Sequence, residues 1–279
     1  IWVYMGDPDR MPELSGHVNT LLPKEHTKAW KRHQSSNWMQ ALEGGIDPGH
    51  AAFLHSKRAG EDRSGPFQFN RLMAQEIEAH VHVLEEEYGV LIATRRDHAD
   101  GDYWRTNVFL MPFYTMVGNF GNTPWVRWSG WIPMDDENTM VWNLTYTFGE
   151  EPLTEEEKTL RGSGNELGKD IDPKNDFRSF ANVANKYGLD RKVQRTESFS
   201  GIPGTNTQDR AVQETMGKIY DRSLERLGTT ALAIIAAETG RLSDLINRLL
   251  DWARMESGKR AYRLEPVAVA AAPAAATAT

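Results

Sequence analysis

Residues 125–148 read WVRWSGWIPMDDENTMVWNLTYTF, and this stretch decides the fold. Aromatic and β-branched residues alternate with polar ones on both sides of the acidic segment at residues 135–138. A period of two is typical of β-strands whose two faces meet different surroundings, and Asp and Asn favour turns. The stretch therefore predicts an antiparallel hairpin.

The same alternation appears upstream, at residues 80–84, 88–94 and 103–114, with Gly, Asn and Asp between the segments. Short connections of this kind join neighbouring antiparallel strands. The sequence thus predicts an antiparallel meander of at least four strands, with one face packed against helices. The fold class that follows is α+β.

Helical patterns lie on both sides of the predicted sheet. A short helix over residues 154–161 begins with a Thr-x-x-Glu capping box. An amphipathic helix is expected from Asp209 to about residue 227, ended by Gly228, and a second helix over residues 232–255. Residues 67–78 are expected to be irregular chain that lies over the candidate site.

The ends of the chain differ in composition from its middle. Residues 1–8 alternate like a strand that runs into a turn, and we expect them to be the remnant strand of something longer. Residues 9–260 form the main domain. Residues 261–279 are rich in Ala and carry a central Pro, so they are expected to be a disordered tail.

Composition excludes several classes of function. The formal net charge of −7 and the pI of about 5.7 argue against a nucleic-acid partner, and the sequence has no apolar run long enough for a membrane span. The chain has no Cys, which excludes disulfides, a thiolate nucleophile and any Cys-ligated zinc or iron–sulfur cluster within it. A cytoplasmic location fits this composition.

The richest stretch for chemistry is residues 37–55, NWMQALEGGIDPGHAAFLH. It places His50 and His55 five residues apart, with Asp47 three residues before the first and Glu43 a turn earlier. Two imidazoles and one distant carboxylate form the facial triad that holds non-haem Fe(II). Ordinary residues of a polar helix would give the same spacing, so both interpretations remain open.

Regular helical geometry does not bring the two rings together. Five residues correspond to a rotation of about 140°, so His50 and His55 would diverge on an unbroken helix. The pair Gly44-Gly45 and Pro48 are expected to interrupt the helix and to allow the required distortion.

The third ligand must come from elsewhere in the chain. Asp209 is the candidate, in the first turn of the predicted amphipathic helix, where it could equally be a charge that complements the helix dipole. His80 and His82 alternate on a predicted strand and are more typical of a solvated face.

Four segments resemble the catalytic region of Rieske non-haem iron aromatic-ring oxygenases, in particular the phthalate 4,5-dioxygenase type of large subunit, which includes aryl O-demethylases. The resemblance extends over about residues 1–235 and is carried by residues 37–55, 109–116 (FLMPFYTM), 131–142 (WIPMDDENTMVW) and 205–230 (TNTQDRAVQETMGKIYDRSLERLGTT). It implies an antiparallel sheet wrapped on a long C-terminal helix, the helix-grip arrangement.

The resemblance also assigns roles to single residues. It implies His50, His55 and Asp209 as the ligands of a mononuclear Fe(II), which makes residues 9–260 a mononuclear-iron catalytic domain. Asp47 corresponds to the carboxylate that bridges, through hydrogen bonds, to a Rieske-cluster histidine of the neighbouring subunit. Asn37 and Glu43 match the pattern and are expected to support the site rather than to bind the metal.

The chain departs from the family in one important respect. The family carries a Rieske [2Fe–2S] cluster held by two Cys and two His, and this chain has no Cys. We therefore expect the [2Fe–2S] centre in a missing domain or a partner chain. The family further implies a reductase or Rieske electron donor and a trimer-based homo-oligomer.

The leading hypothesis is an oxygenase that uses Fe(II) and O2 to hydroxylate or O-demethylate an aromatic, carboxylated substrate. Arg105, on a predicted strand that faces the cavity, is the candidate anchor for the carboxylate, although a surface Arg fits the same position. The alternatives are a non-catalytic binding module of the same fold, an inactive fragment without its electron source, and a zinc hydrolase that uses the same triad.

Overall fold

An antiparallel sheet organises the part of the chain that the computed structural model describes, which comprises residues 7–11, 19, 21–56, 79–97, 101–118, 125–159, 163–226 and 233. Its seven strands lie in the order β1-β7-β6-β5-β4-β3-β2. They are β1 (Thr27–Gln34), β2 (His80–Glu86), β3 (Gly89–Arg96), β4 (Tyr103–Leu110), β5 (Tyr114–Gly118), β6 (Trp125–Pro133) and β7 (Thr139–Thr147). Strands β2 to β7 follow one another as a meander, as predicted, and β1 pairs with the edge of β7.

The predicted hairpin over residues 125–148 is confirmed. Strands β6 and β7 pair in register from Trp125 opposite Thr147 to Pro133 opposite Thr139. The carboxylate of Asp135 accepts hydrogen bonds from the backbone N–H of Glu137 and from the side chain of Asn138, which closes the turn.

The single strand expected over residues 103–114 is wrong. Strand β4 ends at Leu110, and β5 begins at Tyr114 and runs back antiparallel to β4. The intervening Met111–Pro112 peptide bond is cis. Because Pro has no N–H and cannot extend a ladder, the chain turns here.

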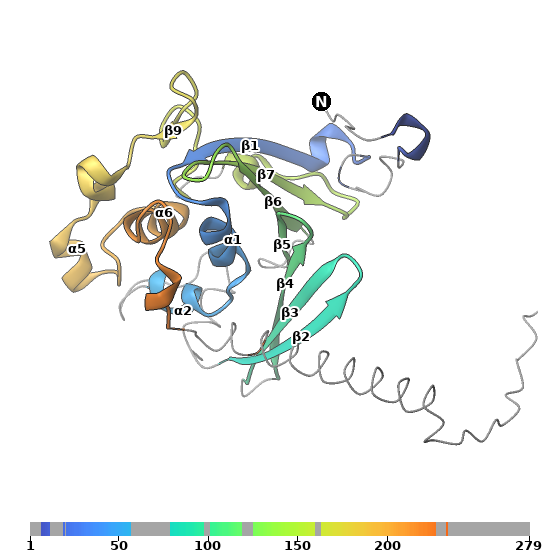
Figure 1. The fold of residues 1–279 in the computed structure, drawn as a ribbon, viewed down its shortest axis with the longest axis horizontal. Helices are drawn as coiled ribbons and strands as arrows, with labels where there is room; N and C mark the ends of the chain where they lie inside the picture. Colours follow the sequence, from blue (N-terminus) through green and yellow to red (C-terminus); the bar gives the residue numbers. More distant parts are fainter. Residues whose placement is uncertain are drawn as a thin grey trace, which may run out of the picture. The chain divides into compact units, whose positions relative to one another are not determined.

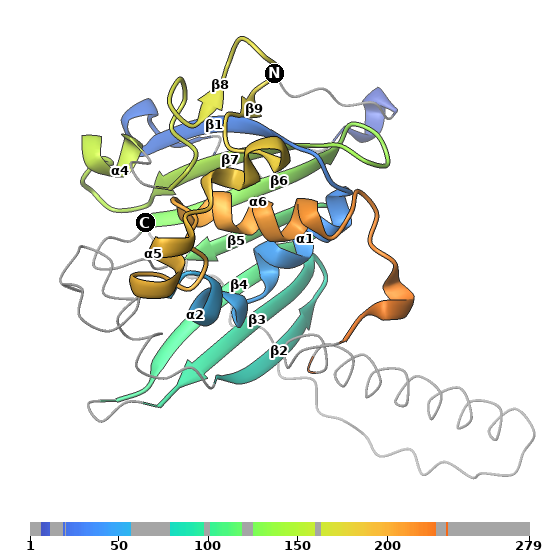
Figure 2. The ribbon, with the colours of Figure 1, turned by 90° about the vertical axis from the view of Figure 1, so that its left-hand side faces the viewer.

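Helices cover one face of the sheet, which we call the inner face (Figures 1 and 2). The described helices are α1 (Trp38–Ile46), α2 (His50–Leu54), α4 (Glu155–Thr159), α5 (Arg191–Thr196) and α6 (Thr205–Thr215), with 3-10 turns η1 (Pro8–Arg10), η4 (Lys24–His26), η5 (Val183–Gly188) and η6 (Arg222–Leu224). Helix α1 packs on β4, β5 and β6 and also against α6. The buried core at this contact contains Ala41, Leu42, Trp131 and Val141.

Smaller elements complete the described region. Strands β8 (Ile171–Asp172) and β9 (Arg178–Ser179) form a separate two-stranded sheet, and β9 packs against β1. The capping box predicted for the helix over residues 154–161 is confirmed, because Thr154 and Glu157 exchange hydrogen bonds at the start of α4.

The helical segment at residues 38–54 is broken at Pro48, as expected, but not at the two glycines. Helix α1 continues through Gly44 and Gly45 to Ile46, and the break lies at residues 47–49. The two glycines serve close packing instead. A Cβ on Gly44 would lie 2.1 Å from Nε2 of Gln213, and one on Gly45 would lie 2.7 Å from Cζ2 of Trp131.

We expect Gly45→Ala to destabilise the protein by up to about 2 kcal/mol. Alanine favours a helix over glycine by about 1 kcal/mol. Overpacking against a rigid indole costs about 1–3 kcal/mol, however, and Trp131 is held by its hydrogen bond to Thr115. Urea denaturation measures the net change in the free energy of unfolding. An increase in this free energy would contradict the close packing of Gly45 against Trp131.

The amphipathic helix expected over residues 209–227 has different bounds. Helix α6 begins at Thr205, after Gly204 with a φ of 81°, and ends at Thr215. Gly217 has a φ of 98°, which turns the chain away from the helix. Asp209 therefore lies in the second turn of α6, not in the first. The long C-terminal helix is not confirmed: of residues 232–255 the structure describes Ala233 alone, and Ala233 is helical.

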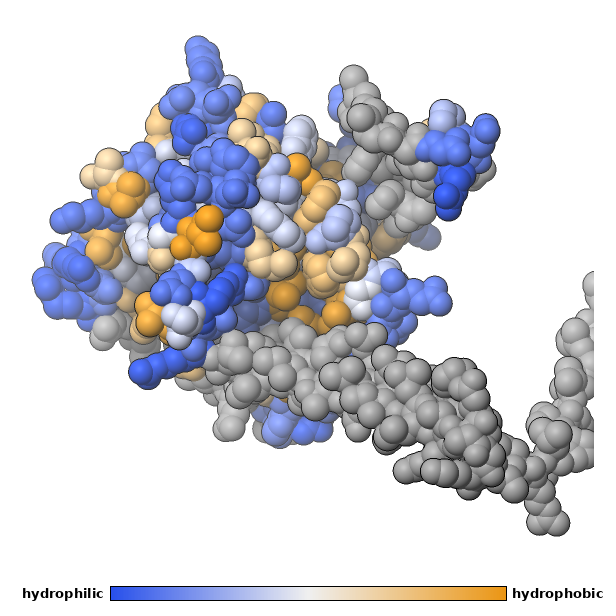
Figure 3. Space-filling view, viewed as in Figure 1, coloured by the Kyte–Doolittle hydropathy of each residue, from blue (hydrophilic) through white to orange (hydrophobic). Residues whose placement is uncertain are grey.

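The opposite face of the sheet, the outer face, is largely apolar. Apolar residues gather on the side of the sheet that faces away from α1 and α6 (Figure 3). By register this face carries Met116 of β5, Trp128 and Ile132 of β6, and Trp142 and Leu144 of β7. Within the described ranges, no helix combines the length and the apolar character that crossing a membrane requires.

The remaining predictions about chain organisation concern residues outside the described ranges. Residues 1–6, 57–78 and 234–279 contain most of the expected remnant strand, the irregular chain over the site and the Ala-rich tail.

Candidate metal centre

The break between α1 and α2 is fixed from both sides. Asn107 of β4 donates to the carbonyl of Ile46, and Arg96 of β3 donates to that of Pro48. The carboxylate of Asp47 accepts hydrogen bonds from the backbone N–H of Gly49 and of His50, both at 2.9 Å. These contacts orient the start of α2 and hence the side chain of His50.

Helix α6 brings a carboxylate to the same place. Its Gln213 accepts a hydrogen bond from Gln34 of β1 and donates to the carbonyl of Ala41 in α1, while Gln40 donates to the carbonyls of Gln213 and Gly217. These side chains tie α6 to α1 and β1. Asp209, four residues before Gln213, is thereby held over α2.

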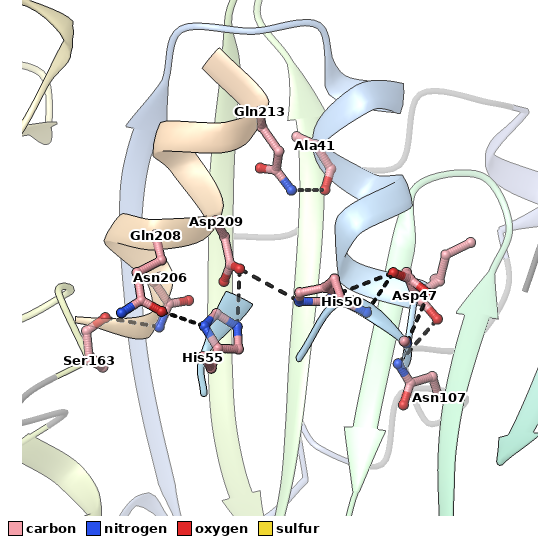
Figure 4. Close-up of polar contacts among 12 residues, drawn as sticks. Ala41, Asp47, His50, His55, Asn107, Ser163, Asn206, Gln208, Asp209 and Gln213 are labelled. Carbon is pink, nitrogen blue, oxygen red and sulfur yellow. Dashed lines mark hydrogen bonds and ion pairs between the residues drawn. The ribbon is translucent and has the colours of Figure 1, made fainter. Parts of the chain in front are cut away.

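Three predicted ligands meet in the structure (Figure 4). Oδ1 of Asp209 lies 3.5 Å from Nε2 of His50 and 3.2 Å from Nε2 of His55. One ligand atom from each residue lies within 4.8 Å of the others, and this is the one such group found among the described residues. The interruption at residues 47–49 is what allows both rings to face one carboxylate.

The tautomer of His55 follows from its neighbours. Nε2 of Gln208 donates to the carbonyl of Ile202 at 2.7 Å, so the amide oxygen is the atom that faces His55. That oxygen lies 2.7 Å from Nδ1 and can only accept, so Nδ1 carries the hydrogen. Nε2 of neutral His55 therefore presents its lone pair to Asp209.

His50 is oriented in the same sense. Its Nδ1 lies 3.3 Å from Oδ2 of Asp47, an arrangement that favours a hydrogen on Nδ1. Two lone pairs and one carboxylate oxygen then face one another, and the buried Oδ1 of Asp209 accepts no hydrogen bond from the two rings while both are neutral. With both rings neutral, such an array repels itself unless a proton or a metal ion lies between its atoms.

The donor set fits a metal ion in kind and in spacing. Ligand atoms about 2.1 Å from an ion and separated by 90–110° lie about 3.0–3.4 Å apart. The separations of 3.2 and 3.5 Å from Asp209 to the two rings are close to this range. Two imidazoles and a carboxylate also leave further positions open for other ligands.

The charges around the triad favour its ionised carboxylate. When no metal is bound, burial would raise the pKa of Asp209, but a protonated His55 that donates to the carboxylate, together with the charges of both imidazoles and of Arg32, outweighs burial and lowers this pKa. Burial would lower the pKa of His55, but Asp209 raises it by hydrogen bonding and by its charge. Each group thus stabilises the charged form of the other.

Arginines line the inner face near the triad. Arg105 is buried on the inner face of β4, and burial lowers its pKa to about 10. Its charge acts on both Asp47 and His55. Arg32 of β1 is also buried and Arg127 of β6 is half-buried, and the charge of Asp209 acts on both.

Two predicted supporting residues lie beside the site without contacting it. The side chain of Asn37 caps α1 by accepting from the N–H of Met39 and also donates to the carbonyl of Asp136. Glu43 forms an exposed ion pair with Arg222 at 2.8 Å. Both act on the position of α1, which precedes the ligand-bearing turn.

Sequence reasoning missed Gln208, although it immediately precedes Asp209. A Gln on a helix carries no signal for a contact with a ring 153 residues away. Arg32 and Arg127 were missed because an Arg in an alternating strand is usually assigned to the solvent face.

The fold and this cluster together define an α+β domain with a candidate two-histidine, one-carboxylate metal centre. The chain belongs to the family described as LigXa C-terminal domain like, whose model matches residues 3–249. The predicted resemblance is confirmed at this level.

Two curated relatives are oxygenase subunits. The 3-chlorobenzoate-3,4-dioxygenase oxygenase subunit of Comamonas testosteroni is 30% identical over 250 residues, which are 84% of this chain and 56% of the relative. The phthalate 4,5-dioxygenase oxygenase subunit of Pseudomonas putida is 32% identical over 248 residues, or 84% of this chain and 54% of the relative. The chain spans about half the length of these relatives.

Solved structures match more distantly. The terminal oxygenase of carbazole 1,9a-dioxygenase from Nocardioides aromaticivorans IC177 is 13% identical with a TM-score of 0.41, covering 77% of this chain and 57% of that one. A 2-oxoquinoline 8-monooxygenase component is 14% identical with a TM-score of 0.38, covering 75% and 47%.

Proposed function

We propose that the chain is the catalytic domain of a Rieske-type oxygenase that hydroxylates or O-demethylates an aromatic acid. The observation that carries the proposal is the arrangement of Nε2 of His50 and of His55 around Oδ1 of Asp209, which calls for a bound cation. These three residues would hold Fe(II). The ion supplies the activation of O2 and leaves the protein to place the substrate.

The chain's own residues would then orient the metal ligands and bind the substrate. Gln208 fixes the ring of His55, and Asp47 fixes the turn that carries His50. Phthalate and 3-chlorobenzoate, which the names of the two relatives contain, are aromatic carboxylates. A buried guanidinium such as that of Arg105 suits a carboxylate, because its planar donors match the two oxygens.

Electrons must reach this site from outside the chain. The sequence has no Cys with which to hold a Rieske [2Fe–2S] cluster, so the cluster would belong to another domain or another chain. The side chain of Asp47 is partly exposed and suits the proposed contact with a neighbouring subunit in a trimer-based assembly. A reductase would be the ultimate electron donor.

Hydrogen peroxide tests the proposed chemistry without that donor. Peroxide is dioxygen plus two electrons and two protons, so an aromatic C–H and H2O2 balance to a phenol and water. We expect the Fe(II)-loaded chain to convert phthalate or 3-chlorobenzoate to a hydroxylated product. The control is the His50→Ala variant with the same added Fe(II), which reports oxidation by free iron.

Chromatography and mass spectrometry of the products decide the outcome. Absence of product from a fully loaded chain, or equal product from the His50→Ala variant, would contradict an oxygenase and favour a binding module. Retention of zinc instead of iron by the purified protein would favour the hydrolase alternative.

A further prediction concerns Gln208. We expect Gln208→Leu to weaken Fe(II) binding about 10–100-fold, because loss of the outer partner of a metal-binding histidine has effects of this size. Gln208→Glu keeps an acceptor for Nδ1 of His55 and should retain most of the affinity. Nitrogen NMR shifts of the imidazole report the tautomer directly. An unchanged tautomer and affinity in Gln208→Leu would show that Gln208 does not position the ring.

A further inference from the structure

Three buried side chains on the inner face carry polar atoms without partners. They are Trp30 of β1 and Asn143 and Thr145 of β7, which are 4%, 4% and 2% exposed. Nε1 of Trp30, Nδ2 of Asn143 and Oγ1 of Thr145 have no hydrogen-bond partner among the described residues. Buried polar groups in native proteins are nearly always paired, so three neighbours without partners need an explanation.

Strand register places these residues side by side. Trp30 is opposite Asn143 across β1 and β7, and Thr145 is opposite Arg127 across β7 and β6. The guanidinium of Arg127 lies 5.7 Å from the centroid of the Trp30 ring. We call these four residues the donor cluster.

The free atoms of the cluster share one chemical character. Oγ of Ser129 donates to Oδ1 of Asn143, so the free end of that amide is its NH2 group. The indole N–H of Trp30 can only donate, and the hydroxyl of Thr145 can donate. Arg127 adds a half-buried positive charge, and desolvation lowers its pKa to about 10. The three side chains therefore present unpaired N–H and O–H groups that can donate, beside the positive charge of Arg127.

The cluster faces the candidate metal centre. Arg127 interacts through its charge with Asp209 of α6, which carries the proposed carboxylate ligand. Arg32, two residues along β1 from Trp30 and on the same face, interacts with Asp209 in the same way. An anion held by the cluster would thus lie on the sheet side of the metal site.

We propose that Trp30, Arg127, Asn143 and Thr145 form a binding subsite for the carboxylate of an aromatic acid, separate from Arg105. A carboxylate supplies acceptor oxygens for the N–H and O–H donors, and the planar guanidinium matches its geometry. The subsite deepens the proposed function, since it would place a substrate beside Asp209, but its binding step does not need iron.

Thr145→Val separates a ligand site from a purely structural role. The substitution removes a buried hydroxyl that has no partner within the described part of the chain, so we expect the melting temperature to rise by about 2–4 °C. The same change should weaken binding of benzoate about tenfold, because a hydrogen bond to a charged acceptor is lost. If Thr145 served only the fold, its replacement would not make the protein more stable and at the same time weaken its binding of benzoate.

The measurement is calorimetric titration of the full chain with benzoate, with and without Fe(II) under nitrogen. Benzamide, which has the same shape without the charge, should bind at least tenfold more weakly than benzoate. Asn143→Asp keeps the acceptor for Ser129 but replaces the free NH2 by a carboxylate beside Arg127, and should abolish benzoate binding. Thr106→Val, on the exposed outer face of β4, is the matched control and should change nothing.

The outcomes distinguish this proposal from that of the metal centre. Benzoate binding that survives in His50→Ala but falls in Thr145→Val supports the subsite, whatever metal the chain holds. Unchanged benzoate affinity in both Thr145→Val and Asn143→Asp would overturn the subsite even if Fe(II) binds as proposed. Loss of binding in Arg105→Met alone would assign the carboxylate to Arg105 instead.

Discussion

His55→Ala should reduce Fe(II) binding from one ion per chain to none at concentrations that saturate the unmodified protein. His55 contributes the imidazole nitrogen that lies closer to Asp209, at 3.2 Å. Without it the ion keeps one imidazole and one carboxylate, which are too few protein ligands for a stable site. His50→Ala should have the same effect. Anaerobic titration with a colorimetric iron assay gives the stoichiometry.

The control for this prediction is His80→Ala. His80 lies on β2 and faces Asp97 at 3.6 Å, in an exposed pair away from the triad. Its removal should leave one Fe(II) per chain. If His55→Ala and His80→Ala bind iron equally, the candidate metal centre is in the wrong place.

Arg210→Met should destabilise the protein by about 3–5 kcal/mol, the largest effect on stability that we expect. Arg210 follows Asp209 on α6 and is 1% exposed. Its guanidinium donates to the carbonyl of Gly164, Oδ1 of Asn165, Oγ of Ser179 and Oγ1 of Thr207. Methionine has similar length but no donors, so it leaves several buried acceptors unsatisfied.

Because this network holds the N-terminal half of α6, the same variant should also bind Fe(II) more weakly. Arg222→Met is the matched control, since Arg222 is partly exposed and pairs with Glu43 and Glu225 at the surface. Arg222→Met should lower the free energy of unfolding by about 1 kcal/mol or less. Equal midpoints for the two variants in urea would contradict the proposed role of the buried network.

The sheet could be predicted from the sequence because its signal is local. Alternation in each segment marks the strands, and short polar turns imply antiparallel neighbours. The pairing of β1 with β7 could not be predicted in this way, because more than 100 residues separate the two strands and their pairing is not a hairpin. The failure at residues 103–114 has a local cause, since Pro112 was included in a strand that ends before it.

The metal centre was partly predictable. The spacing of His50 and His55 suggested a site, and the break needed to bring the rings together was expected, although the glycines proved to be packing residues. Asp209 could not be selected from its own surroundings, because an acidic residue near a helix start is common. Its place depends on how α6 packs against α1, which side chains such as Gln213 and Gln40 determine.

The donor cluster could not be predicted from the sequence. Trp30 and Asn143 are 113 positions apart, and only the register of β1 against β7 makes them neighbours. Whether their polar atoms find partners depends on the packing of the whole inner face. A polar residue in an alternating strand predicts a solvated face by default, and here that default is wrong, because Asn143 and Thr145 are buried.

The most direct test of the account is an anomalous diffraction experiment on crystals of the full chain loaded with Fe(II) under nitrogen. We predict one iron per chain, bound by Nε2 of His50, Nε2 of His55 and a carboxylate oxygen of Asp209. An iron peak elsewhere, or a loaded crystal in which one of these three residues points away from the ion, would contradict it.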